Sequence, residues 1–235
     1  MTVGMTVLAR STRVFVPASL VAAPLGGVVV LADAAREHDG IAAGLDPHVA
    51  TDVLAARSGG VTHAAQVLTF IGSEVVVGLL ALLLVIALLE RRGPFHAGLA
   101  AAAMSVSAAL TVGVKHLVER ARPGATDRLG ASDSTYSFPS GHTLNSAVLL
   151  GLVVVLLLPL VGNRSARIVV TVAAIFLSIG IGASRVYLGY HWASDVVASW
   201  FMAIALVTLV RIAAHRWGDS VNTRFAIRRQ SGSRL

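Results

Sequence analysis

The chain has 235 residues, of which 55% are hydrophobic and only 13% are charged, and it contains no cysteine. This composition is too apolar for a water-soluble globular protein and indicates a membrane protein, while the lack of cysteine excludes disulfides and thiolate metal sites. The net charge of +7 does not indicate nucleic-acid binding, because about half of the excess lies in a tail that follows an apolar run and is expected to meet anionic lipid headgroups.

Six apolar runs follow one another along the chain, bounded by charged residues, Gly or Pro. Each has about 20 residues, the length at which a helix crosses roughly 30 Å of hydrocarbon, and none alternates apolar and polar residues as a membrane barrel strand would. We therefore predict an all-α polytopic membrane protein, a single domain over residues 1–235 built as a bundle of six transmembrane helices. The expected spans are Val14 to Ala35, Val67 to Leu89, Phe95 to Val114, Thr143 to Val161, Ala166 to Ala183 and Trp192 to Ala213.

The first run has an alternative interpretation. Arg10 and Arg13 precede it and Ala32-Asp33-Ala34 lies near its end, which imitates a signal peptide with a small-residue cleavage site. The run is longer than the usual apolar core of a signal peptide, and cleavage would leave five spans. We therefore expect the first helix to be retained.

The connections between the runs are unequal in length. In the first long connection, Asp46-Pro47 starts a stretch in which Val49, Val53 and Leu54 lie at helical spacing, which predicts a short helix at the membrane interface. With the N-terminus inside, 12 of the 19 Lys and Arg residues fall on the cytoplasmic side and 7 on the other. This bias predicts cytoplasmic N- and C-termini in the plasma membrane. The two long connections, Arg36 to Gln66 and Lys115 to His142, are then extracytoplasmic.

Polar residues at the ends of the spans form three groups, and the six-span topology places all three at the extracytoplasmic face. Such residues are costly to place near the hydrocarbon and are functional candidates by default. The groups are Lys115 with Arg122-Pro123, then Pro139-Ser140-Gly141-His142, then Ser184-Arg185 with His191 and Asp195.

These groups contain what the hydrolysis of a phosphate ester requires. Lys115, Arg122 and Arg185 supply three cations to hold a phosphoryl group and the charge that spreads over its oxygens in the transition state. Ser140 and Gly141 precede an apolar run, so their backbone N–H groups can bind an anion at a helix N-terminus.

The two histidines differ in their neighbours. If His191 begins a helix, Asp195 lies four residues on along the same face and can accept a hydrogen bond from one imidazole nitrogen, leaving the other nitrogen unprotonated as a nucleophile. His142 has no such carboxylate in its group and is better placed to protonate the leaving oxygen and then activate water.

Together the groups resemble the signature of the type 2 phosphatidic acid phosphatase (PAP2) family, KxxxxxxRP, PSGH and SRxxxxxHxxxD, with all eleven fixed positions filled. The resemblance covers about Thr62 to Ala214, followed by a basic tail over 215–235. It implies a six-helix core, a phosphohistidine on His191, protonation of the leaving group by His142, and no metal or cofactor. One departure is Ser199, where members often have glycine.

The resemblance implies a membrane enzyme that dephosphorylates a lipid at the outer face, with phosphatidate, phosphatidylglycerol phosphate or a polyprenyl diphosphate as the substrate. A phosphotransferase that uses the same phosphohistidine is the alternative, because only the acceptor differs. A transporter or other non-enzymatic anion-binding protein would carry charges at mid-depth, and Glu74 alone approaches this pattern. The expected partners are the lipid substrate and membrane lipids, and the sequence leaves the oligomeric state open.

Overall fold

The computed structural model describes residues 18–37, 40–131 and 134–232, and this part of the chain contains helices and no strand. The prediction of an all-α protein is therefore confirmed for the described residues; Arg10, Arg13 and the first residues of the expected first span lie outside them. The α-helices are α1 (Ser19–Glu37), α2 (Gly40–Ala55), α3 (Gly59–Ile71), α4 (Glu74–Arg92), α5 (Pro94–Val118), α6 (Gly141–Leu152), α7 (Arg164–Tyr187) and α8 (Ala193–Gly232). Three short segments complete the order: the 3₁₀ turn η1 (Ala125–Asp127), the π-helical η2 (Val153–Leu157) and the 3₁₀ turn η3 (Leu158–Leu160).

The helices identify a multi-pass membrane protein. In the described part of the chain, five helices are long and apolar enough to cross a bilayer, namely α1, α5, α6 with its continuation to Leu160, α7, and α8 as far as Gly218. A sixth span exists if α3 and α4, which meet at an angle of 46°, are counted together. The expected span from Val67 to Leu89 crosses this bend. There Ser73 accepts a hydrogen bond from the backbone N–H of Val76 and starts a new helix, whose first residue, Glu74, is exposed.

The bundle is apolar on its outside and closely packed inside. Large side chains such as Val75, Leu117 and Phe176 are 72%, 71% and 69% exposed, which suits contact with lipid tails. On α5, small residues recur on one buried face, and small residues let neighbouring helix backbones approach closely. They are Ala97, Ala100, Ala103, Ser107 and Thr111.

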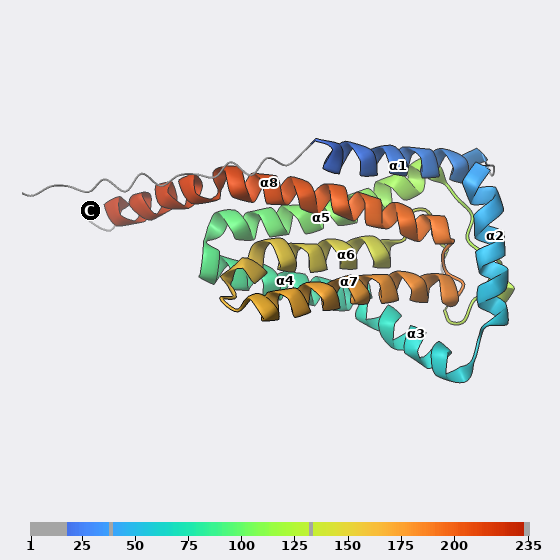
Figure 1. Cartoon of the computed structure of the whole chain (residues 1–235). Helices are drawn as coiled ribbons and strands as arrows, with labels where there is room; N and C mark the ends of the chain where they lie inside the picture. The colour runs from blue at the N-terminus through green and yellow to red at the C-terminus, as the bar shows by residue number, and fades with distance from the viewer. Residues whose placement is uncertain (1–17, 38–39, 132–133, 233–235) are drawn as a thin grey trace, which may run out of the picture.

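Helix α2 lies across one end of the bundle, where α7 ends and α8 begins (Figure 1). It confirms the helix predicted in the first long connection, although it starts at Gly40, before Asp46-Pro47, so that Pro47 lies inside it. Helix α1 packs along α8, and its Leu31 and Ala35 join Val118, Phe138 and Ala198 in a small apolar cluster. The end of the bundle beneath α2 is where the three predicted polar groups meet.

Candidate active site

The connection from α7 to α8 brings His191 back over the start of α8. Gly189 adopts a positive φ of 75°, and a Cβ atom there would lie 2.6 Å from the carbonyl oxygen of Asp127, so only glycine fits this turn. The backbone N–H groups of Tyr190 and His191 both donate to the carbonyl oxygen of Arg185, at 3.0 and 3.2 Å. The chain therefore reverses within a few residues and leaves His191 facing α8.

His191 lies against Asp195, as the sequence spacing predicts. The Nδ1 atom is 3.4 Å from Oδ2 of Asp195, and both side chains are buried. Helix α8 begins at Ala193, later than His191, and the contact forms because Oδ2 also accepts the backbone N–H of Trp192 at 2.9 Å. This is the back-bond of a helix capping box, in which a side chain in the first turn holds the residue before the helix.

Burial keeps the imidazole of His191 neutral. It lowers the pKa of His191 from 6.5 to about 4, and the positive charges of Arg185 and Arg122 act in the same direction, while Asp195 opposes them. If Nδ1 carries the proton and faces Asp195, the lone pair is on Nε2. A neutral imidazole with one nitrogen held by a carboxylate can act as a nucleophile at neutral pH.

Arg122 lies on the open side of His191, with Nη1 3.3 Å from Nε2. Backbone carbonyl oxygens accept hydrogen bonds from its guanidinium: Nη1 donates to that of Tyr190 at 2.7 Å, and Nε donates to that of Thr135 at 2.8 Å. The ammonium of Lys115 reaches the same loop, because it donates to Oγ1 of Thr135 at 3.1 Å and to the carbonyl oxygen of Tyr136. The first predicted group therefore meets the third at His191.

Arg185 approaches from the last turn of α7. Its guanidinium stacks over the ring of Tyr190 at 4.0 Å, and Nη1 donates to Oγ1 of Thr69 at 2.6 Å. Thr69 lies on α3, so the bent helix pair contributes to the position of this cation. The charge of Arg185 acts on His191, which groups it with the other predicted phosphate-binding residues.

The PSGH segment packs against α8 through Ser199. The backbone N–H of Ser140 donates to Oγ of Ser199 at 3.0 Å, and that hydroxyl donates to the carbonyl oxygen of Asp195 at 2.7 Å. The N–H of Ser140, which the sequence assigned to anion binding, is thus engaged by α8. The backbone N–H groups of Gly141 to Thr143, at the start of α6, have no acceptor within the helix, which suits the binding of an anion. His142 follows there, half-buried.

Two buried charges at this site were missed in the sequence analysis. Arg120 donates through Nη1 to Oδ1 of Asp195 and through Nη2 to Oδ2 of Asp46, each at 2.6 Å. The sequence analysis placed Asp46 at an interface and treated Arg120 as one of several extracytoplasmic cations. Their signal was weak, since an Asp and an Arg 74 residues apart do not form a recognisable motif.

A small cavity of about 50 Å³ reaches His191 beneath α2. Among its lining residues are Ala50, Val53 and Leu54 of α2, with Pro123 and Trp192 opposite.

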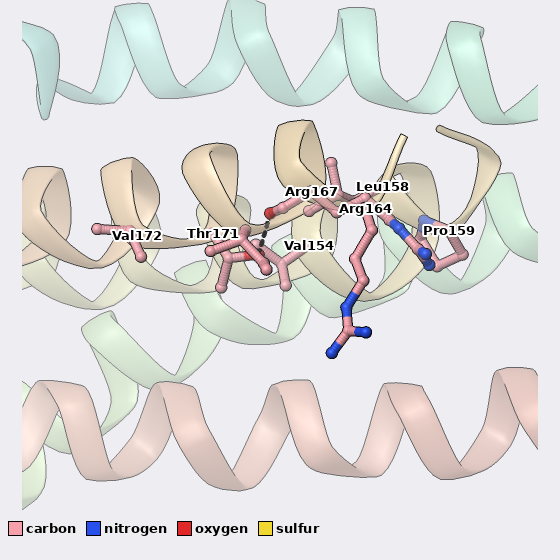
Figure 2. Close-up of a pocket in the computed structure, with 8 residues that line it drawn as sticks. Val154, Leu158, Pro159, Arg164, Arg167, Thr171 and Val172 are labelled. Atoms are coloured by element: carbon pink, nitrogen blue, oxygen red, sulfur yellow. Dashed lines mark hydrogen bonds between the residues drawn. The ribbon is translucent and has the colours of Figure 1, made fainter. Parts of the chain in front are cut away.

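A larger cavity, of about 440 Å³, lies at the start of α7 beside Arg164 and Arg167 (Figure 2). The α-helix from Arg164 to Arg185 is about 30 Å long, roughly the thickness of the hydrocarbon layer. The predicted site residues and the larger cavity therefore lie near opposite ends of the bundle, about the thickness of the hydrocarbon layer apart.

In the described part of the chain, no three His, Asp or Glu side chains are grouped so as to hold a metal ion. The sequence profile of the PAP2 superfamily matches residues 96–219, slightly more than half of the chain. The chain belongs to the PAP2 superfamily. The matched region includes all three polar groups, so the resemblance noted from the motifs is confirmed.

Two proteins similar to this PAP2 chain come from Bacillus subtilis. Phosphatidylglycerophosphatase B of strain 168 is 32% identical over 101 residues, which cover 42% of this chain and 48% of that protein. The alignment thus spans about half the length of that relative. The crystal structure of a transmembrane PAP2-type phosphatidylglycerolphosphate phosphatase matches with a TM-score of 0.71 at 23% identity, covering 82% of this chain and 94% of the other. This second likeness concerns the fold.

Proposed function

We propose that the chain dephosphorylates a lipid phosphate, with Nε2 of His191 as the nucleophile. The observation that supports this most directly is the setting of His191, which is buried, neutral at pH 7, and placed between Asp195 at Nδ1 and Arg122 at Nε2. A phosphoryl group in front of Nε2 would meet the guanidinium of Arg122. Arg122 would then give up its contact with Nε2 and form charge-assisted hydrogen bonds with the phosphoryl oxygens.

In the first step, Nε2 of His191 attacks phosphorus and forms a P–N bond while the bond from phosphorus to the lipid oxygen breaks. His142 gives a proton to that oxygen, so the lipid leaves as an alcohol, or as a lipid monophosphate where the substrate is a diphosphate. Lys115, Arg122 and Arg185 bind the phosphoryl oxygens, whose charge is greatest in the transition state.

In the second step, a water molecule attacks the phosphohistidine. His142, now neutral, takes a proton from the water, the P–N bond breaks with its electron pair returning to Nε2, and inorganic phosphate is released. Asp195 stabilises the imidazole when it carries positive charge as phosphohistidine. The donor set uses side chains and backbone N–H groups alone, so we expect no metal requirement.

The substrate is a phosphorylated lipid at the extracytoplasmic face of the plasma membrane. The name of the 32% identical relative, phosphatidylglycerophosphatase B, makes phosphatidylglycerol phosphate the first candidate, ahead of phosphatidate and a polyprenyl diphosphate. The distribution of Lys and Arg along the sequence supports this orientation, with the N- and C-termini in the cytoplasm.

The decisive experiment measures phosphate release by the purified protein in detergent. The panel contains these three lipids, each with and without EDTA, and the variants are His191→Ala and, as a matched control, His63→Ala, an exposed histidine on α3. We expect release that EDTA does not change, that His63→Ala retains, and that His191→Ala lowers by at least about a thousandfold. Abolition by EDTA, or full activity in His191→Ala, would refute the mechanism.

The same assay with a lipid alcohol or sugar as acceptor separates hydrolysis from transfer. Radiolabelled phosphate should appear as inorganic phosphate. Its transfer to the acceptor in preference to water would identify a phosphotransferase that uses the same histidine.

A further inference from the structure

A buried cluster of charges links helix α2 to the start of α8. Asp46 of α2 is 2% exposed and Arg120, in the segment after α5, is 6% exposed. Besides the bond from Arg120, the carboxylate of Asp46 accepts the backbone N–H of Ser194 at 2.9 Å and its hydroxyl at 2.5 Å. Asp46 therefore ties both Arg120 and the N-terminal turn of α8 to the helix that crosses the end of the bundle (Figure 1).

Arg120 divides its planar guanidinium between two carboxylates. Nη2 bonds Asp46 and Nη1 bonds Asp195, each at 2.6 Å, while the guanidinium also lies 5.5 Å from the ring of Trp192. A rigid fork with bonds to both carboxylates has little freedom to turn. Since each of these charges is buried, removal of one leaves another without its partner, which is strongly unfavourable.

The orientation of His191 depends on this arrangement. Oδ2 of Asp195 faces Nδ1 of His191, and Oδ1 of the same carboxylate is fixed by Arg120. Because the bond to Arg120 fixes Oδ1, the carboxylate of Asp195 cannot rotate without breaking that bond. The position of Oδ2, and with it the orientation of the imidazole, therefore depends on Arg120, which is not one of the fixed positions of the signature motifs. Substitution of a residue that orients a reactive group through a second side chain commonly lowers activity about 10- to 100-fold.

We propose that Arg120 and Asp46 are positioning residues for the His191 nucleophile, and that α2 is for this reason part of the active site. Asp46 holds Arg120, Arg120 holds Asp195, and Asp195 holds the imidazole. This inference rests on the proposed function, since it assigns a role within the same reaction.

The test compares Arg120→Gln and Asp46→Asn with two controls, Arg91→Gln at the opposite end of the bundle and Asp52→Asn on α2, both exposed. We expect each test variant to lower kcat about 10- to 100-fold and to change KM less than about threefold, because neither residue touches the phosphoryl group. The controls should match the wild-type protein. The double variant should be little worse than Arg120→Gln alone, because residues that act through one chain of contacts are not additive.

The pKa of His191 is a second measure of the coupling, because a substitution that affected only the stability of the fold would not shift it. The charged groups that act on this imidazole are Asp195 of α8, Arg185 of α7 and Arg122 of the segment after α5. Loss of the positive charge of Arg120 leaves the carboxylates less neutralised and should raise the pKa of His191. Loss of the negative charge of Asp46 should lower it. ¹⁵N NMR of the histidine side chains in the purified protein measures both shifts, with His191→Gln to assign the signal.

The outcomes separate the two proposals. If the wild-type protein releases no phosphate that depends on His191, the proposed function fails, and the opposite NMR shifts still decide the coupling. If the wild-type protein is active while both variants keep kcat within about twofold, or if the two shifts have the same sign, the positioning role is refuted. Should Arg120→Gln not fold, Arg120→Lys keeps the charge without the fork, and it must also lower kcat and not KM.

Discussion

Lowering the pH from about 7 to about 5.5 should reduce kcat/KM for the substrate dianion less than twofold. The reason is the burial of His191, which lowers its pKa to about 4, so that nearly all of the imidazole is still neutral at the lower pH. An imidazole with the ordinary value of 6.5 would lose about eightfold of its neutral form over the same interval. Because the neutral imidazole is the nucleophile, kcat/KM falls with decreasing pH only where His191 becomes protonated.

The assay is a pH profile of kcat/KM, which reports the ionisation of free enzyme and free substrate. Because a phosphate monoester itself ionises near pH 6, rates are expressed per dianion, with phosphatidylglycerol phosphate or whichever lipid of the panel turns over fastest. His63→Ala serves as a control for the other histidines. An acid limb centred near 6.5 and unaffected by His63→Ala would show that His191 titrates as an exposed imidazole and would refute the argument from burial.

Three further predictions concern packing and topology. Gly141→Ala would bring a methyl group to 2.9 Å from Cγ2 of Thr111 and should lower the free energy of unfolding by about 1–3 kcal/mol; Thr111→Ser, which removes that methyl, should restore most of the loss in a denaturant titration. Ser199→Ala removes the hydroxyl between α6 and α8 and should lower the thermal stability by the equivalent of about 1 kcal/mol; an unchanged melting temperature would contradict this. Since the chain has no cysteine, an impermeant maleimide should label Gly60→Cys in intact cells and Ser165→Cys only after permeabilisation, and the reverse pattern would invert the proposed orientation.

That several signature residues lie close together could be predicted, because part of their arrangement depends on local spacing. The approach of Asp195 to His191 depends on four residues of chain, and Arg122 reaches the same imidazole. Hydropathy likewise located most of the spans, because a run of about 20 apolar residues is a local property. The bend between α3 and α4 escaped this reasoning, since Gly72 and Ser73 interrupt the run too briefly to lower its average hydropathy, while the Ser73 cap is enough to start a new helix.

The contacts between distant segments could not be predicted in this way. Asp46 and Arg120 are each ordinary residues for a connection exposed to solvent, and only the tertiary fold shows that they are buried together. Ser199 was noted as a departure from the family pattern, but its bond to the N–H of Ser140 links α8 to α6, which a single sequence does not reveal. In both cases the two partners lie far apart in the sequence, so no local pattern carries the information.

Helix α7 is divided along its length in a way that bears on how far relatives of this chain can diverge. Only 11% of its apolar span is buried, whereas its last turns contain the buried Ile181, Gly182, Ser184 and Arg185. Lipid tails accept any apolar side chain of suitable length, so substitutions such as Val169→Leu or Phe176→Ile alter few protein contacts. Substitutions along the lipid-facing part of α7 should therefore be tolerated, whereas substitutions in its last turns would disturb the site. A fold retained at 23% identity is the expected result of such uneven constraint.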